Sequence, residues 1–507
     1  MYQPYFHNMN KIYFFLLLLI SQSAFCQINF GLKQEIEKST GMGEQTKVYG
    51  NTMFVGKYYK DEVNVYTRQE DGTWVFLQTL TPSDKPATTN TDWGFGHAMA
   101  FNDNYAVIAA EYKGLVRNNA GGVYFYRKGS DGFWQEESVI ENPTVYSYYG
   151  GKNVTIHKNK ATISHNNGYP RFVHIFERNN NGTWEISDTI SETEFRGIDG
   201  IKSYYDDTTY IAMSFLFDDQ RIKEFRLQPN GKWVNTQTLK SGITTYDTYF
   251  GQFLSVDNNQ QMAVGAADFK VTGPNETLLN SAGKVFIYKR VNNVWTLQQE
   301  IVSPEPHEYE GFGGDVFIKG DMLIIASEYW TDIPGSPKGA LYIYKNIDGV
   351  WTLAQTYKSE TNNQIGRNIA YENDQIISFG YRSIHVLENL KDCQGVVGGS
   401  AKLNSCKVCY DGTTGLNLQQ SEEQCIPTAL YSASSEIKVI VSPNPFDSQV
   451  NIQAPDNAKI KLTDSYGRVL ATDITSGVFE TGQLKSGLYF LIVEIDGEKH
   501  VQKIIRK

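Results

Sequence analysis

Short apolar runs separated by turn residues recur along most of the chain. Residues 311–356 show the pattern most clearly, with four runs at Asp315–Ile318, Met322–Ala326, Ala340–Tyr344 and Trp351–Gln355. Asp348 and Gly349 separate the last two runs, and this dipeptide predicts a hairpin because both positions tolerate a positive φ. Four strands joined in this way predict one antiparallel sheet, which needs similar sheets on both sides to bury its two apolar faces.

The same unit is found seven times, at spacings of roughly 46 to 62 residues, which is the range of propeller blades. In six units a tryptophan follows the last hairpin turn: Trp74, Trp134, Trp184, Trp233, Trp295 and Trp351. The seventh unit has the strand Ile384–Leu387 with no tryptophan after it. An aromatic residue followed by glycine opens several units, as at Phe95-Gly96, Tyr149-Gly150, Phe250-Gly251 and Phe312-Gly313.

These repeats resemble the FG-GAP repeat of integrin-α-type propellers, over Ile28–Leu390. The resemblance implies an all-β fold with a seven-bladed β-propeller at residues 27–390. The segment Phe30–Ile36 is similar to the outer strand Trp295–Ile301 of the fifth unit, whereas the seventh unit lacks an outer strand. We therefore predict that Phe30–Ile36 completes the seventh sheet and removes two open edges at once.

The N-terminus has the pattern of a secretory signal peptide at residues 1–26. Lys11 precedes the apolar run Ile12–Ile20, and small residues at Ala24 and Cys26 predict cleavage between Cys26 and Gln27. The alternative is a lipoprotein modified at Cys26, against which the bulky Phe25 argues. No other stretch is long and apolar enough to predict a transmembrane segment.

Cleavage there leaves four cysteines within residues 391–430: Cys393, Cys406, Cys409 and Cys425. An even number in a short exported segment predicts disulfides, with three pairings open. The alternative is a zinc site, since Cys406 and Cys409 have metal-ligand spacing. Export and the lack of a nearby histidine favour disulfides, and we interpret the segment as a short, disulfide-rich linker module.

From residue 435 the chain is again strand-like. Pro443–Phe446, Ser465–Arg468, Leu484–Tyr489 and the basic end Lys503–Lys507 resemble the C-terminal sorting domain of type IX secretion. The resemblance implies an Ig-like β-sandwich at residues 435–507 that the type IX machinery recognises. It also implies passage through the periplasm to the outer-membrane surface or the medium. The alternating strands and their turns indicate a β-sandwich independently.

Composition and motifs exclude several functions. The formal net charge is −10 without a long basic run, which argues against nucleic acid as a partner. No zinc-protease motif, nucleophile elbow or phosphate loop occurs, so the sequence predicts no catalytic residues, cofactor or metal. Glu111 and Glu328 occupy the same place in their units, and we interpret them as solvated loop acids. The family resemblance leaves calcium open, but no acidic calcium loop supports it.

Aromatic residues outside the repeat pattern are the best ligand-binding candidates. They fall in loops between the second and third strands of a unit or between units, which open on the same face: Trp93, Tyr112, Tyr246, Tyr309, Tyr329 and Trp330. The hairpin tryptophans are predicted instead to wedge between blades. We therefore favour a secreted or surface-anchored binding or adhesion protein with a glycan or protein ligand. The alternatives are a polysaccharide-active hydrolase or lyase, or a structural surface component.

Overall fold

The computed structural model describes residues 28–37, 45–57, 60–86, 92–114, 120–141, 149–165, 172–191, 202–214, 221–243, 248–273, 276–333, 335–390, 402–403, 409–410, 440–455, 457–464, 468–495 and 498–507. Within these residues the structure is all-β and contains no α-helix. The chain divides into two compact units, Met1–Leu418 and Gln419–Lys507.

The first unit contains seven antiparallel sheets of four strands, which we number in chain order by their first innermost strand. Sheet 1 contains β2 (Thr46–Tyr49), β3 (Thr52–Lys57), β4 (Glu62–Arg68) and β5 (Trp74–Leu80). Sheet 2 contains β6 (Phe95–Phe101), β7 (Tyr105–Ala110), β8 (Gly122–Lys128) and β9 (Trp134–Glu141). Sheet 3 contains β10 (Tyr149–His157), β11 (Lys160–His165), β12 (Phe172–Arg178) and β13 (Trp184–Ser191). Sheets 4 and 5 are β14 (Ser203–Tyr205), β15 (Thr209–Ser214), β16 (Arg221–Leu227), β17 (Trp233–Lys240); and β18 (Leu254–Asp257), β19 (Gln261–Ala266), β22 (Lys284–Val291), β23 (Val294–Ile301). Sheets 6 and 7 are β24 (Asp315–Lys319), β25 (Met322–Ser327), β26 (Ala340–Ile347), β27 (Val350–Lys358); and β28 (Asn368–Glu372), β29 (Gln375–Phe379), β30 (Ser383–Asn389), β1 (Phe30–Glu37).

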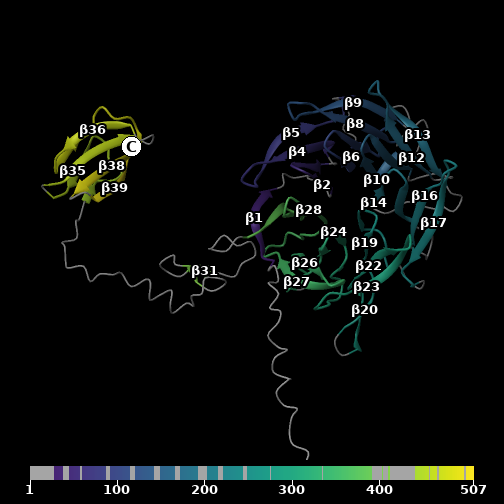
Figure 1. The fold of residues 1–507 in the computed structure, drawn as a ribbon. Coiled ribbons are helices and arrows are strands. Elements are labelled where there is room, and N and C mark those ends of the chain that lie inside the picture. Colours follow the sequence, from purple (N-terminus) through teal and green to yellow (C-terminus); the bar gives the residue numbers. More distant parts are fainter. Residues whose placement is uncertain are drawn as a thin grey trace, which may run out of the picture. The chain divides into compact units, whose positions relative to one another are not determined.

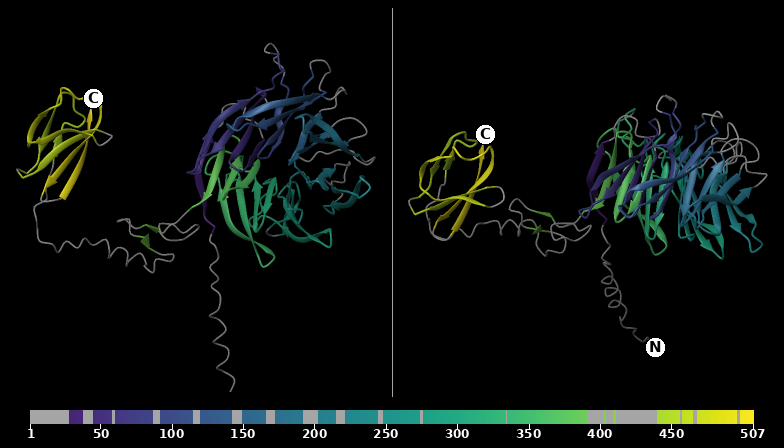
Figure 2. Two further views of the ribbon diagram at one scale, coloured as in Figure 1. Left: turned by 45° about the horizontal axis from the view of Figure 1, so that its top comes forward. Right: turned by 90° about the horizontal axis from the view of Figure 1, so that it is seen from above.

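The seven sheets stand side by side around a common centre, with the first strand of each sheet innermost (Figure 1). Each innermost strand contacts the innermost strand of the next sheet, and β28 of sheet 7 contacts β2 of sheet 1. The circle of sheets is therefore closed. The second of the two views in Figure 2 shows neighbouring sheets covering one another's faces. This explains why middle strands such as β25 are buried along their whole length, whereas the outermost β5 is buried only at its two end residues.

The strand at the start of the described chain closes this circle. β1 pairs antiparallel with β30, from Phe30 opposite Asn389 to Glu37 opposite Ser383. The predicted pairing of Phe30–Ile36 with the seventh unit is therefore confirmed. A two-stranded hairpin, β20 (Val271–Thr272) and β21 (Leu278–Leu279), projects from sheet 5, and a second pair, β31 (Lys402–Leu403) and β32 (Cys409–Tyr410), follows sheet 7.

The aromatic-Gly pairs bring neighbouring sheets into close contact. Gly96 has a φ of +92°, and a Cβ atom there would lie 2.8 Å from Val63 of the preceding sheet. Gly313 repeats this arrangement, with a φ of +89° and 2.9 Å to Val285. Only glycine combines this backbone conformation with so close an approach. The repeated glycine is therefore explained by packing between sheets.

The hairpin tryptophans are wedges, as predicted. Trp134 is 4% exposed and makes an edge-to-face contact with Phe54 of the preceding sheet at 5.2 Å between ring centroids. Trp184 stacks on Phe125 of sheet 2 at 4.4 Å. Aromatic pairs in these geometries add to the hydrophobic stabilisation of the interface.

A glutamine four residues after the tryptophan forms a second link between sheets. The Gln78 side chain accepts a hydrogen bond from the Trp134 backbone N–H (2.7 Å) and donates one to the Trp134 carbonyl (3.1 Å). The same two-bond clasp joins Gln237 to Trp295, Gln299 to Trp351, Gln355 to Phe30, and Gln34 to Trp74. Phe30 thus takes the place of the tryptophan in sheet 7, and Gln34 takes the place of the glutamine.

A β-bulge precedes each clasp. The pairing of β4 with β5 skips Leu77, three residues after Trp74, and the pairing of β1 with β30 skips Lys33, three residues after Phe30. A bulge bends the strand and re-aims the following side chain. The sequence Trp-x-x-x-Gln is therefore the local signal for the clasp, and β1 carries it in the form Phe-x-x-x-Gln.

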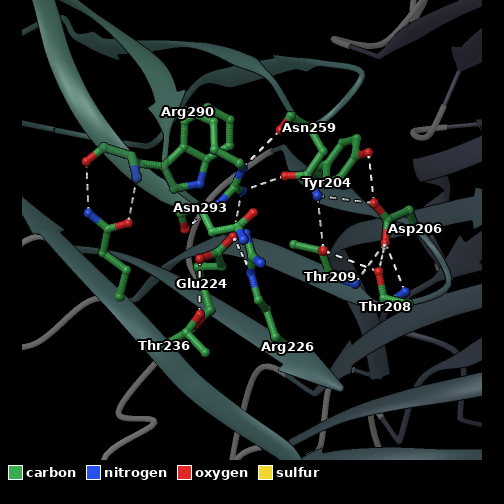
Figure 3. A network of polar contacts seen from close by, with 12 residues as sticks. Tyr204, Asp206, Thr208, Thr209, Glu224, Arg226, Thr236, Asn259, Arg290 and Asn293 are labelled. Atoms are coloured by element: carbon green, nitrogen blue, oxygen red, sulfur yellow. Dashed lines mark hydrogen bonds and ion pairs between the residues drawn. The ribbon is translucent and has the colours of Figure 1, made fainter. Parts of the chain in front are cut away.

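The interface between sheets 4 and 5 uses a buried ion pair in addition (Figure 3). The Arg290 guanidinium lies 2.5 Å from Glu224, which is 2% exposed, and 4.0 Å above the Trp295 ring. Arg290 also donates from Nε to the Asn259 carbonyl at 2.9 Å. Removing one partner from such a pair leaves an uncompensated buried charge, so this network holds the two sheets in a fixed arrangement.

The second unit contains a three-stranded and a four-stranded sheet around one apolar core. The strands are β33 (Ile440–Ser442), β34 (Gln449–Gln453) and β37 (Gly477–Glu480) in one sheet, and β36 (Val469–Ile474), β35 (Lys459–Asp464), β38 (Gly487–Ile495) and β39 (Glu498–Arg506) in the other. Phe446, Val450 and Leu491 are fully buried in this core. The unit therefore has a core of its own.

Candidate ligand-binding cleft

A cleft of about 530 Å³ opens at the end of the first unit where the innermost strands begin. Sheets 5 and 6 supply most of its lining, and Gln45 and Arg367 extend it to the starts of the innermost strands of sheets 1 and 7. The lining residues are Gln45, Tyr249, Gln252, Phe253, Ala267, Asp268, Ser281, Tyr309, Gly311, Gly314, Glu328, Tyr329 and Arg367. A cleft of this volume is within the range of small-molecule and glycan-sized sites.

The loop backbone holds two tyrosines of this cleft in the left-handed region. Tyr249 precedes Phe250-Gly251 with a φ of +54°, at the position where Gly94 and Gly311 stand in sheets 2 and 6. Tyr309 has a φ of +62°, and its backbone N–H donates to the Asn280 carbonyl at 2.8 Å. A bulky residue in this conformation is strained, and such strain tends to be found at ligand sites.

Opposite charges cross the cleft between sheets 6 and 7. The Arg367 Nε donates to the Glu328 carboxylate at 3.2 Å, and both side chains are partly exposed. Glu111 stands at the same place in sheet 2 but is paired with His97 of its own sheet and is buried. Both glutamates were predicted to be solvated loop acids, but Glu111 is buried and each of the two has a basic side chain as its partner. Glu328 alone lies in the cleft.

The four predicted tyrosines separate into three groups. Tyr309 and Tyr329 line the cleft and are 61% and 48% exposed. Tyr112 is partly exposed but is outside the cleft. It lies against a loop glycine of its own sheet, as Tyr329 does in sheet 6. Tyr246 lies outside the described residues.

Trp93 and Trp330 require a correction, because both are buried. The Trp93 ring lies between the Lys85 and Lys113 ammonium groups, and its backbone N–H donates to Asp61. Trp330 is 6% exposed, with the Lys358 ammonium 4.4 Å above its ring. These tryptophans therefore support the loops from beneath and offer no ring face to a ligand.

The sequence analysis missed Tyr249, Asp268 and Arg367 as cleft residues. A signal for Tyr249 was present, since a tyrosine stands where two other units have glycine just before the aromatic-Gly pair. Arg367 follows directly after the Ile365-Gly366 pair of the seventh unit, and the packing of sheet 7 against its neighbour, sheet 6, brings it to Glu328.

Glu310, beside the cleft, is a buried acid whose side chain is not part of the lining. It is 1% exposed, and burial raises the pKa of its carboxyl group to about 7 from an ordinary 4.5. The folded protein therefore binds a proton here between pH 4.5 and 7 that the unfolded chain does not bind. This group leaves stability unaffected below pH 4.5, lowers it progressively as the pH rises from 4.5 to about 7, and causes no further change above that.

We expect Glu310→Gln to remove this loss. The free energy of unfolding of the variant minus that of wild type should be about 3 kcal/mol larger at slightly alkaline pH than at acidic pH. The measurement is urea unfolding followed by tryptophan fluorescence, since every tryptophan lies in the first unit. Glu305→Gln, at an exposed neighbour, is the matched control. If the free energy of unfolding changed with pH in the same way for wild type and Glu310→Gln, the Glu310 carboxyl group would not be the cause of the stability loss.

The remaining predicted residues are mostly outside the described part of the chain. Cys409 is disulfide-bonded, whereas Cys393, Cys406 and Cys425, and the cleavage residues Cys26 and Gln27, are not described, so the disulfide pairing and the cleavage site stay predictions. In the described ranges no group of three or more His, Cys, Asp and Glu side chains is placed to hold a metal ion. No helix among the described residues has the length and hydropathy needed to cross a membrane.

Family comparisons assign two parts of the chain. Residues 441–507 match the secretion system C-terminal sorting domain, and residues 295–344 match the FG-GAP repeat. No curated protein is significantly similar to the chain. The chain thus carries an FG-GAP repeat in a propeller-like all-β unit, followed by a type IX sorting domain. It is exported by type IX secretion to the cell surface or the extracellular space.

Several solved structures are weakly similar. A candidate 6-phosphogluconolactonase from Bacteroides uniformis is 11% identical with a TM-score of 0.45, over 70% of this chain and 93% of that chain. The periplasmic gluconolactonase of Pseudomonas aeruginosa is 12% identical with a TM-score of 0.38, over 89% of this chain and 98% of that chain. These similarities are too weak to assign an activity to this chain.

Proposed function

We propose that the chain is an exported binding protein that presents the cleft to an extracellular glycan or protein. In this proposal residues 27–390 are a seven-bladed β-propeller, residues 391–430 a disulfide-linked spacer, and residues 435–507 an Ig-like sorting domain. The closed circle of contacts between the innermost strands supports the propeller. The juxtaposition of Tyr309 and Tyr329 in one cleft carries the binding proposal.

The cleft is at the end of the unit suited to recognition. Hairpins such as Asp71-Gly72 and Asp131-Gly132, at the opposite ends of the strands, are short and fixed by their own backbone hydrogen bonds. The cleft instead lies among long loops of unlike sequence, which a rigid scaffold can hold for binding. Tyrosine adds rigid contact area at a low entropic cost. The paired charges of Glu328 and Arg367 and the carboxylate of Asp268 suit a hydroxyl-rich partner, and we favour a polysaccharide.

The double variant Tyr309→Ala with Tyr329→Ala tests this proposal. We expect it to weaken ligand binding about tenfold or more, because exposed aromatic anchors dominate such contacts. Its melting temperature should stay close to that of wild type, since both rings are largely exposed. The measurement is an affinity titration with a ligand found by array screening. Tyr49→Ala, at an exposed tyrosine of the β2–β3 hairpin, is the matched control and should bind normally. Unchanged affinity in the double variant would exclude the cleft as the binding site.

A further inference from the structure

A second cavity, of about 250 Å³ and open to solvent, is lined by the innermost strands at the centre of the sheets. Its walls come from sheets 1, 3, 4, 5, 6 and 7, and it shares no lining residue with the cleft. Most of the lining is apolar, including Val154, Leu254 and Ile369. Two lysines, Lys47 of sheet 1 and Lys202 just before sheet 4, also line it.

Among the described residues, one acid pairs with these lysines, and its oxygens already accept other hydrogen bonds. Asp315 of sheet 6 is fully buried and accepts Lys202 Nζ at 2.6 and 2.8 Å. It also accepts the backbone N–H of Val316 at 2.7 Å and of Ile369 at 2.8 Å. The Lys47 side chain makes no hydrogen bond or ion pair within the described part of the chain. The charges of Lys202 and Asp315 offset each other, so the charge of Lys47 leaves the cavity with one positive charge in excess.

Two neutral donors at the cavity are also unsatisfied. Thr46 and Asn368 are lining residues that are each only 3% exposed, and the buried Thr46 hydroxyl and Asn368 side-chain amide have no hydrogen-bond partner in the described structure. A buried donor left without a partner is costly and rare. Burial, and then the charge of Lys202, lowers the pKa of Lys47 to about 8, which is the response of an ammonium group without a counter-ion.

We propose that this central cavity binds a small oxyanion, a carboxylate or phosphate ion, between Lys47, Lys202 and the Thr46 and Asn368 donors. Its oxygens would satisfy both neutral donors and balance the excess charge. The cavity is smaller than the roughly 300–1,000 Å³ of sites for drug-sized ligands, so the ligand is a small ion. The inference is independent of the ligand of the cleft.

The experiment uses the purified exported protein, titrated calorimetrically with sodium acetate and with inorganic phosphate at pH 7 and constant ionic strength. We expect saturable 1:1 binding of at least one anion, and the anion that binds distinguishes a carboxylate site from a phosphate site. Lys47→Met should weaken binding at least tenfold. It should also keep or raise the melting temperature in chloride buffer, since it removes a partly buried ammonium group that has no ion-pair partner. Lys232→Met, at an exposed lysine in the turn before β17, is the control and should bind like wild type.

Two further results separate this site from its alternatives. Acetate binding should weaken as the pH rises above about 8, because Lys47 then loses its proton. The variant Tyr309→Ala with Tyr329→Ala should bind the anion normally, since those residues do not line this cavity. The absence of saturable binding for both anions, or equal binding by wild type and Lys47→Met, would overturn the proposal.

Discussion

Deleting residues 28–37 is expected to make the protein aggregate. The deletion removes β1 and exposes the edge of β30, whose backbone groups then lie open to pairing with another chain. It also removes the buried ring of Phe30 and two clasps, Gln355 to Phe30 and Gln34 to Trp74. The deletion should lower the free energy of unfolding by several kcal/mol, because the buried ring of Phe30 and the hydrogen bonds of both clasps are lost.

The measurements are size-exclusion chromatography with light scattering and thermal unfolding. Leu32→Ser, at an exposed position of β1 that keeps the strand, is the control and should behave like wild type. A truncated protein that stays monomeric and melts at the temperature of the parent would show that β1 is not needed to close the circle of sheets.

Deleting residues 441–507 is expected to trap the protein in the periplasm with its first unit folded. These residues are the sorting domain, and they have their own core, in a compact unit of their own. We expect at least a tenfold loss from the surface and medium, measured by fractionation and immunoblotting. The periplasmic material should keep the tryptophan fluorescence of the folded first unit. Fusing residues 435–507 to an unrelated periplasmic protein is the control and should carry that protein out of the cell. Normal surface levels of the truncated chain would rule out this route.

The sequence predicted the repeated sheets because each unit carries its own local signals. The Asp-Gly turns, the aromatic-Gly pairs and the hairpin tryptophans act within one sheet or between neighbouring sheets, so they recur in register. Because Phe30–Ile36 is similar in sequence to the outer strand of the fifth unit, its pairing with the seventh sheet could also be predicted. The clasp was also visible in the sequence, as a glutamine four residues after Trp74, Trp233 and Trp351.

The sites were harder to predict, because they are assembled from distant positions. Lys47 of sheet 1 and Lys202 just before sheet 4 meet only because both line one cavity, and Asp315 of sheet 6 reaches Lys202 from a third part of the chain. Loop position alone could not separate the exposed ring of Tyr329 from the buried ring of its neighbour Trp330. Which side of a loop faces solvent depends on the residue packed beneath it, such as Lys358 against Trp330.

Screening the exported protein on an array of bacterial and plant polysaccharides and surface proteins tests the binding function most directly. Wild type, Tyr49→Ala and the variant Tyr309→Ala with Tyr329→Ala should be screened side by side. We expect wild type and Tyr49→Ala to bind the same small set of ligands, and the double variant to lose that set while remaining folded. A ligand set that the double variant retains, or the absence of any ligand for wild type, would contradict binding at the cleft.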